Sequence, residues 1–157
     1  MDEMTKFRRC LGKFATCVTV VSCRDQDGKP CGITANSFSS VSLEPPLVLW
    51  NIAKVSKSLS AYLEAEHFAI NVLSNQQQSL ASHFATSENG LFDNISYRDS
   101  PQNVPVLSNT LAHLECRTHS IHDCGDHHII IGDVINFELS DGKPLIFYGG
   151  NYTAIKD

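Results

Sequence analysis

The sequence has no long apolar run, no cluster of basic side chains and no Cys-x-x-Cys pair. A membrane-spanning helix needs roughly 18 consecutive apolar residues, and no segment comes near that length. The net charge is −5 and the 12 Lys and Arg residues are scattered, which argues against nucleic acid as a partner, because phosphate backbones attract basic patches. The first residues also lack the apolar core of a signal peptide. We therefore expect a cytoplasmic protein that binds neither nucleic acid nor a membrane.

Several catalytic and nucleotide-binding motifs are also missing. The sequence contains no Gly-x-Ser-x-Gly element, no Walker phosphate loop and no Gly-x-Gly-x-x-Gly fingerprint, which leaves serine-hydrolase, P-loop and Rossmann sites without support. What is present is an ordinary globular composition, with 42% hydrophobic and 18% charged residues. A chain of this length can bury a sizeable core, and we expect one domain over residues 1–157.

Cysteine and histidine are the residues that could carry metal or redox chemistry. The cysteines are spread along the chain at Cys10, Cys17, Cys23, Cys31, Cys116 and Cys124. Because a chain with a full apolar core does not need a disulfide framework, we expect free and mostly buried thiols. Residues 119–128 hold four His, one Cys and two Asp, but they straddle a predicted turn, so we expect no metal site. A metal-binding module there is the weakest of three functional hypotheses.

Apolar periodicity and turn residues predict about seven strands and three short helices. Helices are expected over residues 3–11 and 58–66 and after a Ser74–Gln77 capping box, and residues 86–109 are expected to be irregular with one short strand at most. Strands are expected over residues 14–23, 30–38, 47–52, 68–73, 111–121, 128–139 and 145–148. Asp27-Gly28 and Asp141-Gly-Lys143 predict hairpin turns, so the sheet should be mostly antiparallel and closed into a barrel.

The segment Gly32–Leu47 has the most unusual composition in the chain. It holds five hydroxyl side chains, one Asn and a Pro-Pro pair, and it lies between two predicted buried strands. Its backbone and small side chains offer many neutral hydrogen-bonding groups, which suits a flat polar ligand lying along a strand end. A Ser-rich surface loop is the alternative that composition leaves open.

The order of the residues in this segment resembles that of the flavin reductase family. The resemblance starts at Phe7-Arg8, runs through Gly12–Val21 and is most specific over Thr34-Ala-Asn-Ser-Phe-Ser-Ser-Val-Ser42 and Gly125-Asp-His127. It continues through Phe68–Leu73, Phe84-Ala85, Pro105–Leu107, Leu114–Cys116, Ile131–Val134 and Pro144–Tyr148. The family includes the reductase components of two-component flavin monooxygenases.

This resemblance implies a fold and an activity. The fold is an FMN-binding split β-barrel, mainly β, antiparallel and of Greek-key type, with a few short helices. The activity is that of an NAD(P)H-dependent flavin reductase, which transfers hydride from NADH or NADPH to FMN or FAD in a homodimer, with the flavin beside the subunit interface. A partner monooxygenase that uses the reduced flavin is a further implication. A non-catalytic FMN-binding split-barrel protein is the alternative, since fold does not settle function.

The resemblance also assigns roles to individual residues. The flavin ring system and ribityl chain would be lined by Thr34, Ala35, Asn36 and Ser37, with Ser40, Val41, Ser42 and Asn51 close by. The phosphate would bind at a helix start to Ser56, Lys57 and Ser58. Phe84 and Tyr152 would edge the pocket, and His127 would position the nicotinamide.

Three positions depart from the family pattern. Cys17 stands where a glycine is usual, Ile33 stands where Met is common, and Leu91 occupies a position that is often basic. The loss of a cation at Leu91 lowers the expected affinity for the pyrophosphate of FAD. None of the three changes removes a group that hydride transfer requires.

Overall fold

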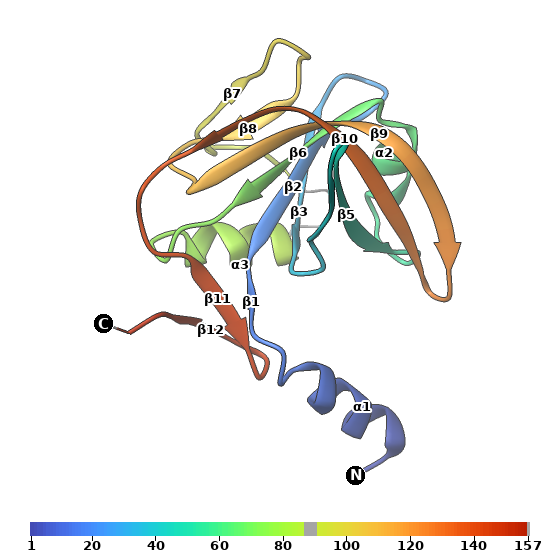
Figure 1. The fold of residues 1–157 in the computed structure, drawn as a ribbon, viewed down its shortest axis with the longest axis vertical. Coiled ribbons are helices and arrows are strands. Elements are labelled where there is room, and N and C mark those ends of the chain that lie inside the picture. Colours follow the sequence, from blue (N-terminus) through green and yellow to red (C-terminus); the bar gives the residue numbers. More distant parts are fainter. Residues whose placement is uncertain (87–90, 157) are drawn as a thin grey trace.

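The computed structural model describes residues 1–86 and 91–156, and strands dominate it (Figure 1). The described residues form three helices: α1 (Glu3–Leu11), α2 (Leu59–Glu64) and α3 (Gln78–Thr86). The strands of the same residues are β1 (Thr16–Cys17), β2 (Thr19–Arg24), β3 (Pro30–Ala35), β4 (Ser39–Leu43), β5 (Pro46–Ala53), β6 (His67–Val72), β7 (Tyr97–Asp99), β8 (Pro105–Leu107), β9 (Ala112–Cys124), β10 (His127–Leu139), β11 (Leu145–Tyr148) and β12 (Asn151–Ala154). No helix within the described ranges is long and apolar enough to cross a membrane.

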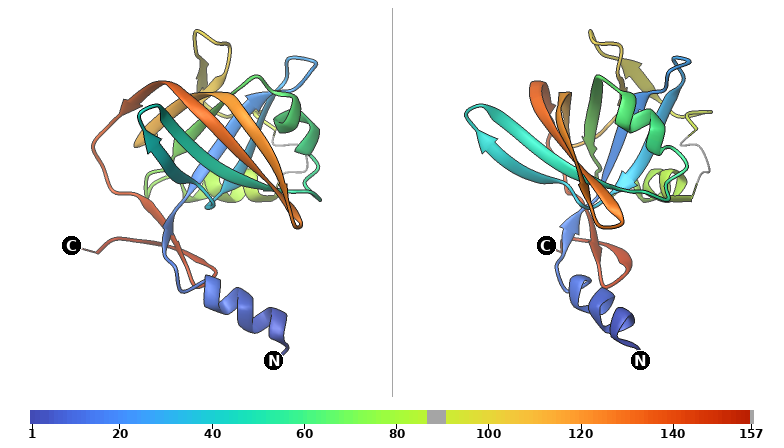
Figure 2. Two further views of the ribbon diagram at one scale, coloured as in Figure 1. Left: turned by 45° about the vertical axis from the view of Figure 1, so that its right-hand side comes forward. Right: turned by 90° about the vertical axis from the view of Figure 1, so that its right-hand side faces the viewer.

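Seven of these strands form one antiparallel sheet in the order β3-β2-β6-β9-β10-β5-β4, and the sheet curls on itself (Figure 2). Its two end strands, β3 and β4, do not pair with each other in the part of the chain that the structure describes. A smaller sheet, β1-β11-β12, and the β7-β8 hairpin lie outside it. The expected mainly β, antiparallel split barrel is confirmed, although the hydrogen-bonded ladder is open rather than closed.

Local turn chemistry explains the first hairpin. β2 and β3 pair from Thr19↔Ala35 to Arg24↔Pro30, as the Asp27-Gly28 pair predicts. Gly28 has a φ of +78°, a left-handed conformation that glycine adopts without steric cost. The Asp25 carboxylate accepts hydrogen bonds from the backbone N–H groups of Asp27 and Lys29 at 2.9 and 2.8 Å, which closes the turn.

The predicted strand over residues 14–23 is divided between two sheets. β1 pairs with β11, whereas β2 pairs with β3 and β6. At the crossing point, Val18 donates its N–H to the Leu145 carbonyl and accepts from the Leu73 N–H, each at 3.0 Å. A continuous β-branched run does not reveal this break, because both halves suit a strand equally well.

The predicted hairpin at Asp141-Gly-Lys143 is wrong. β10 pairs with β9 and β5, and β11 pairs with β1 and β12, so the two strands beside this turn are not partners. The turn instead carries the chain from the large sheet to the small one. Strands β4 and β12 were not expected, and residues 86–109 contain two paired strands, β7 and β8, where one short strand at most was expected. Part of the predicted irregular stretch, residues 87–90, lies outside the described residues.

The core has two main clusters on opposite faces of the large sheet, since Val20 and Val21, which are adjacent on β2, belong to different clusters. The first contains Trp50, Tyr62 and Phe68, and the Trp50 and Tyr62 rings meet edge to face at 5.1 Å. The second contains Phe84 and Phe92, whose ring centroids are 5.0 Å apart. Fully burying one large apolar side chain stabilises the fold by about 1.5–3 kcal/mol, so these rings hold the sheet and α3 together.

The six cysteines are free, as expected, but only half of them are buried. Cys23, Cys31 and Cys116 lie in the first core cluster. The exposed thiols are those of Cys10, Cys17 and Cys124. The expectation of mostly buried thiols is therefore wrong for the N-terminal segment and for the β9–β10 hairpin.

Helix α1 occupies the predicted residues but has no buried side chain. Asp2 caps its N-terminus by accepting from the Thr5 N–H at 2.9 Å, and Gly12 ends it. The apolar stripe is solvent-exposed, and the helix stands away from the barrel at one end of the molecule (Figure 1). Its amphipathic pattern is therefore not used within the chain.

Candidate functional site

The end of β3 is tied to the middle of β5 by one hydroxyl group. Ser37 Oγ accepts from the Asn51 N–H at 2.9 Å and donates to the Asn51 carbonyl at 3.1 Å. Because β3 pairs only with β2, the backbone groups along its other edge are not used by the sheet. These groups face a cavity of about 480 Å³. The cavity is lined by residues 33–37 of β3 and its extension, 50–53 of β5, and Cys124, His127 and Ile129.

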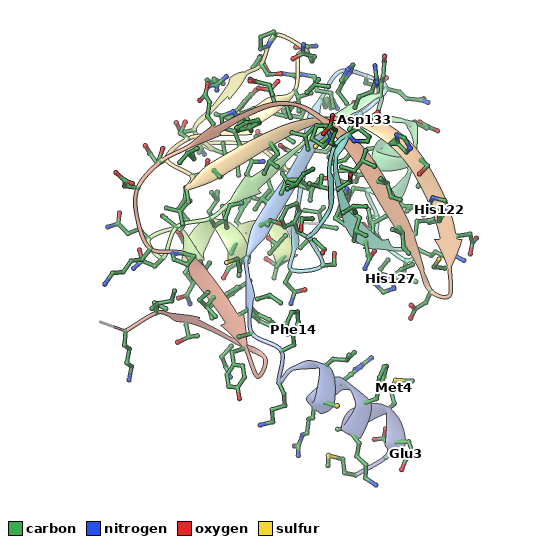
Figure 3. All side chains as sticks on the ribbon, viewed as in Figure 1. Glu3, Met4, Phe14, His122, His127 and Asp133 are labelled. Atoms are coloured by element: carbon green, nitrogen blue, oxygen red, sulfur yellow. The ribbon has the colours of Figure 1, made fainter. Side chains whose placement is uncertain are left out.

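The β9–β10 hairpin carries His127 to this cavity. β10 lies beside β5 with His127 opposite Ala53, and Figure 3 shows the imidazole next to the end of β5. The Lys54 N–H donates to the Asp126 carbonyl at 2.9 Å, and Lys54 Nζ lies 2.6 Å from Asp123 Oδ1. Two contacts from one residue therefore hold the hairpin tip against β5.

His127 itself is held by its neighbour in sequence. Its Nδ1 lies 2.6 Å from Asp126 Oδ1, and this hydrogen bond, together with the charge of the imidazole, holds the pKa of the Asp126 carboxyl below its ordinary value. The bond orients the ring and leaves Nε2 available to a ligand. The His127 side chain is 46% exposed, so a molecule entering the cavity can reach it.

A second cavity of about 370 Å³ adjoins the first. The two share Ile33 and Ala53, and the second is otherwise lined by Gly32, residues 55–58 and residues 84–86. Ser56 and Ser58 place their hydroxyls 3.3 Å apart here, beside Lys57. Ser58 precedes α2 but makes no side-chain cap, and α2 has only six residues, so the phosphate-binding capacity rests on these side chains rather than on a long helix.

The wall between β3 and α3 depends on a glycine. A Cβ atom at Gly32 would lie 2.6 Å from the Phe84 ring, so only glycine lets the ring pack there. The Thr34 hydroxyl donates to the Ala81 carbonyl at 2.6 Å and fixes α3 to the same strand. Phe84 is thereby held at the edge of the second cavity, as predicted.

Two buried polar atoms at the first cavity lack a hydrogen-bonding partner. They are Asn51 Oδ1 and Trp50 Nε1. A buried unsatisfied polar atom costs about 1–3 kcal/mol. Trp50 is fully buried in the first core cluster, so of the two residues only the half-buried Asn51 is placed to meet a ligand in the cavity. An isoalloxazine ring has donors and acceptors along its pyrimidine edge, so the residues present fit a flavin.

The structure brings together most, but not all, of the predicted site. Both cavities together are lined by the predicted Thr34, Ala35, Asn36, Ser37, Asn51, Ser56, Lys57, Ser58, Phe84 and His127. Ser40, Val41 and Ser42 lie on β4 and line neither cavity. Tyr152 lies on β12, where its ring packs on Phe147 at 5.5 Å. The roles of all the predicted site residues stay predictions.

Some lining residues were not expected. Trp50, Ala53, Cys124 and Ile129 enter the first cavity because β5 and β10 pair side by side. The alternation of buried and half-buried residues along β5 could have indicated which of its side chains face inward. No comparable sequence signal predicts that β5 pairs with β10, which lies far from it along the chain.

Three of the four histidines in residues 119–128 have local partners, whereas His128 Nδ1 is buried without one among the described residues. His119 Nδ1 lies 3.0 Å from Asp133 Oδ1 on the outer side of the sheet, and His122 Nε2 lies 3.0 Å from Ser120 Oγ. Among the described residues, no group of three or more His, Cys, Asp or Glu side chains is arranged to hold a metal ion.

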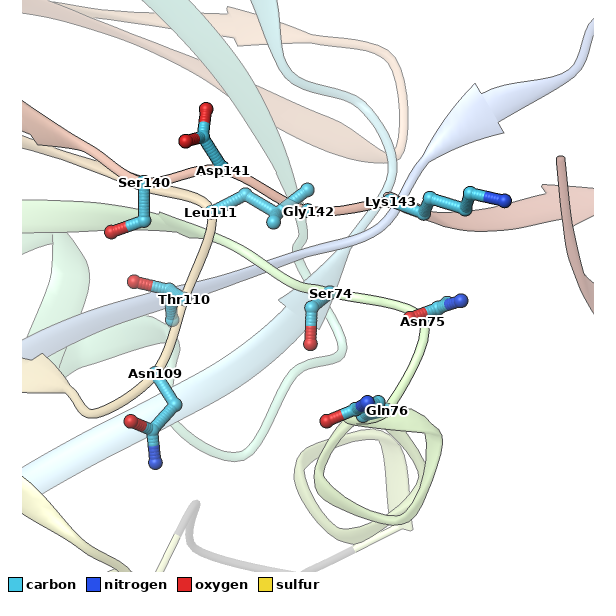
Figure 4. Close-up of a pocket in the computed structure, with 10 residues that line it drawn as sticks. All are labelled: Ser74, Asn75, Gln76, Asn109, Thr110, Leu111, Ser140, Asp141, Gly142 and Lys143. Atoms are coloured by element: carbon cyan, nitrogen blue, oxygen red, sulfur yellow. The ribbon is translucent and has the colours of Figure 1, made fainter.

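A separate cavity of about 500 Å³ shares no residue with the two described above (Figure 4). It is lined by Ser74, Asn75, Gln76, Asn109, Thr110, Leu111, Ser140, Asp141, Gly142 and Lys143. Its polar side chains come from three turns, and it contains neither a His nor a Cys. The chemistry of a redox site is therefore concentrated at the first two cavities.

Comparison with known proteins identifies the class to which this fold and site belong. The model of the flavin reductase like domain matches residues 11–156. FMN reductase (NADH) SmoA from Agrobacterium fabrum is 49% identical over 151 residues, covering 96% of this chain and 86% of SmoA. The reductase subunit HsaB of a flavin-dependent monooxygenase from Rhodococcus jostii is 41% identical, covering 96% of this chain and 77% of HsaB.

Solved structures agree with these matches. Nitrilotriacetate monooxygenase component B from Mycobacterium thermoresistibile superposes with a TM-score of 0.92 at 37% identity, covering 98% of this chain and 87% of that one. The NADH:FAD oxidoreductase SgcE6 from Streptomyces globisporus, in complex with NAD and FAD fragments, gives a TM-score of 0.92 at 35% identity, covering 98% and 93%. The chain belongs to the flavin reductase like family, which confirms the family predicted from its motifs.

Proposed function

We propose that this protein reduces a flavin with NADH and releases the reduced flavin to an oxygenase component. The observation that carries the proposal is the first cavity, where the open edge of β3, the unpartnered Asn51 oxygen and His127 converge. A bound flavin supplies the ring that accepts the hydride, and the protein binds and orients the reactants. NADH is the nicotinamide in the name of SmoA, and FMN or FAD appears in the names of SmoA and SgcE6.

The residues divide the binding task between the two cavities. Thr34–Ser37 and Asn51 offer backbone and amide groups to the flavin ring, while Ser56, Lys57 and Ser58 offer hydroxyls and a cation to the phosphate. The shared residues Ile33 and Ala53 make the passage between the cavities apolar. A ligand with a flat ring at one end and a phosphate at the other matches this layout.

The activity is tested by mixing the purified protein with FMN or FAD and following the loss of the reduced-nicotinamide absorbance with NADH and with NADPH. We expect turnover with NADH and at least one of the flavins. A protein that binds flavin but oxidises neither nicotinamide above the buffer rate would contradict the proposal and would favour the non-catalytic alternative.

The role of His127 is tested by His127→Ala. We expect the KM for NADH to rise up to tenfold, the equivalent of one hydrogen bond of about 0.5–1.5 kcal/mol, because Nε2 no longer contacts the nicotinamide. FMN affinity, measured by quenching of flavin fluorescence, should not change. Unchanged kinetics with both substrates would contradict this assignment.

Release of reduced flavin to a second protein is supported by the relatives named as reductase components of flavin-dependent monooxygenases. A cytoplasmic location agrees with this role, since both nicotinamide and flavin are cytoplasmic metabolites. The test is a coupled assay in which the reductase and an oxygenase are separated by a dialysis membrane. Oxygenase turnover across the membrane supports a diffusing flavin, and its absence contradicts free release.

A homodimer is the proposed assembly. Phe7, Leu11 and Phe14 on and after α1 are each at least 59% exposed, and so are Phe137 and Leu139 on β10. A soluble chain rarely leaves this much apolar surface uncovered, and an isologous dimer would cover both patches. Sedimentation equilibrium should give twice the chain mass, and a monomer at micromolar concentration would contradict the assembly.

A further inference from the structure

Two free cysteines face each other across the β2–β3 hairpin. Cys23 and Cys31 are directly opposite in the antiparallel register, and both belong to the first core cluster. The Cβ atoms of directly opposite residues lie about 4.5–5.5 Å apart, and a disulfide needs about 3.8 Å. A closure of about 1–2 Å between the two strands, next to the Asp25–Lys29 turn, would therefore join the two sulfur atoms.

The two thiols also differ in pKa and in accessibility, as expected if one thiol is oxidised first and the other then attacks it. Interaction with Cys31, together with burial, raises the pKa of Cys23, while interaction with Cys23 lowers the pKa of Cys31. The Cys31 thiol itself donates to the Lys29 carbonyl at 3.7 Å. Cys31 retains 6% of its surface, whereas Cys23 is fully buried. Cys31 is thus the thiol that a small oxidant can reach and the one with more thiolate character.

We propose that Cys23 and Cys31 form a reversible cross-strand disulfide in response to hydrogen peroxide. The peroxide comes from the enzyme's own product, since a reduced flavin transfers two electrons to O₂ and yields oxidised flavin and H₂O₂; this source rests on the proposed function. The Cys31 thiolate attacks one peroxide oxygen, the O–O bond breaks and hydroxide leaves, which gives a sulfenic acid; the hydroxide takes up the proton released by the thiol and becomes water. Cys23 then attacks the Cys31 sulfur, the S–O bond breaks, and a second water leaves with the Cys23 proton.

The bond acts on the flavin site through the next residue in the chain. Cys31 is followed by Gly32, which packs so closely on Phe84 that an added Cβ would lie 2.6 Å from the ring. Pulling Cys31 toward β2 shifts Gly32 relative to Phe84, and both residues line the second cavity. Oxidation therefore weakens flavin binding and slows the production of reduced flavin when no oxygenase consumes it.

Peptide mapping tests the bond directly. Trypsin separates Phe14–Arg24, which contains Cys17 and Cys23, from Asp25–Lys54, which contains only Cys31, because the Lys29-Pro30 bond resists cleavage. A Cys17→Ser variant removes the exposed neighbour and leaves one cysteine in each peptide. After peroxide treatment we expect the two peptides to be linked with the loss of two hydrogen atoms, and to separate again with dithiothreitol.

Enzyme kinetics test the expected effect of the disulfide on flavin binding. Peroxide should raise the KM for FMN several-fold in the Cys17→Ser protein, and dithiothreitol should restore it. Cys23→Ala in the same background keeps the Cys31 thiol but cannot form the bond, so its KM should not respond. Cys10→Ser is the matched control, at an exposed cysteine that lines neither cavity, and should respond like the parent.

Two results would overturn the inference: unlinked peptides after peroxide, or linked peptides with an unchanged KM for FMN. If Cys23→Ala does not fold, the mapping of the Cys17→Ser protein still decides, because that protein keeps the buried pair. A failure of the proposed function can be told apart from a failure of this inference. The first would appear as absent NADH oxidation in the untreated protein. Peroxide added from outside would still show whether the disulfide forms.

Discussion

At the scale of single residues, Gly32 links the packing of the barrel to the ligand site. Its position against the Phe84 ring leaves no room for a side chain, yet its conformation is not one that glycine alone can adopt. The requirement is therefore steric rather than conformational. Because any shift of Gly32 also moves its neighbours Cys31 and Ile33, the close packing of Gly32 on Phe84 restricts the positions of both.

Gly32→Ala should lower stability by about 1–3 kcal/mol, the usual cost of overpacking a well-filled core. This corresponds to a melting temperature lower by several degrees, measured by differential scanning calorimetry, together with weaker FMN binding. Gly12→Ala is the matched control, because its added Cβ would meet only atoms at 3.4 Å or beyond. Equal effects of the two substitutions would contradict the steric argument.

His113 makes stability depend on pH. Burial lowers the pKa of His113 below its ordinary value of 6.5, the charge of Arg98 adds to this effect, and Glu138 and Glu115 oppose it. Over some pH range His113 is therefore protonated in the unfolded chain but still neutral in the folded chain. Stability contributed by the neutral imidazole is present above about pH 6.5 and is lost as the pH falls through the folded pKa.

The measurement is urea unfolding between neutral and mildly acidic pH. We expect the free energy of unfolding of the wild type to fall with pH more steeply than that of His113→Gln, which cannot take up the proton. His122→Gln, at an exposed histidine, is the control and should follow the wild type. Parallel pH profiles for all three proteins would contradict the role of His113.

At the scale of secondary-structure elements, the site is made where β3, β5 and the β9–β10 hairpin meet. The hairpin reaches beyond the barrel, and Lys54 is what holds its tip through Asp123 and the Asp126 carbonyl. The Lys54–Asp123 pair is solvent-exposed, with 36% and 70% of the side chains accessible, so its contribution is small. Its effect falls on the orientation of His127 rather than on the stability of the fold.

Lys54→Met should raise the KM for NADH about two- to fivefold, as expected for an exposed ion pair worth about 0.5–1 kcal/mol. FMN affinity and thermal stability should change little. The exchange of the two charges, Lys54→Asp with Asp123→Lys, should recover part of the loss because it restores the attraction. A loss of FMN affinity equal to that of NADH would contradict a positioning role.

At the scale of the whole molecule, α1 buries none of its side chains against the residues that the structure describes. Its apolar side chains lie on one side of the helix, and the segment of residues 1–13 carries four basic against two acidic residues, while the whole chain has a net charge of −5. Figure 3 places Met4 and Phe14 well away from the barrel. A second copy, whose barrel is acidic, offers both apolar and electrostatic complementarity.

Phe7→Ser should shift the assembly from dimer to monomer without lowering the stability of the monomer, because Phe7 is 59% exposed in the single chain. Analytical ultracentrifugation measures the first effect and urea unfolding the second. Lys6→Gln, on the same helix but bonded to Glu3, is the control and should remain dimeric. A dimeric Phe7→Ser protein would show that α1 is not part of the interface.

The sequence by itself determined the local features and the family. The Asp27-Gly28 turn, the extent of α1 and the motif Thr34–Ser37, which lines the first cavity, depend on neighbouring residues or on an ordered motif, so they could be predicted without the fold. The tertiary structure alone decided the break at Val18, the failure of the Asp141-Gly-Lys143 hairpin and the entry of Trp50 and Cys124 into the site. These features depend on strand pairing between distant segments, and β-rich runs of similar composition do not specify their partners.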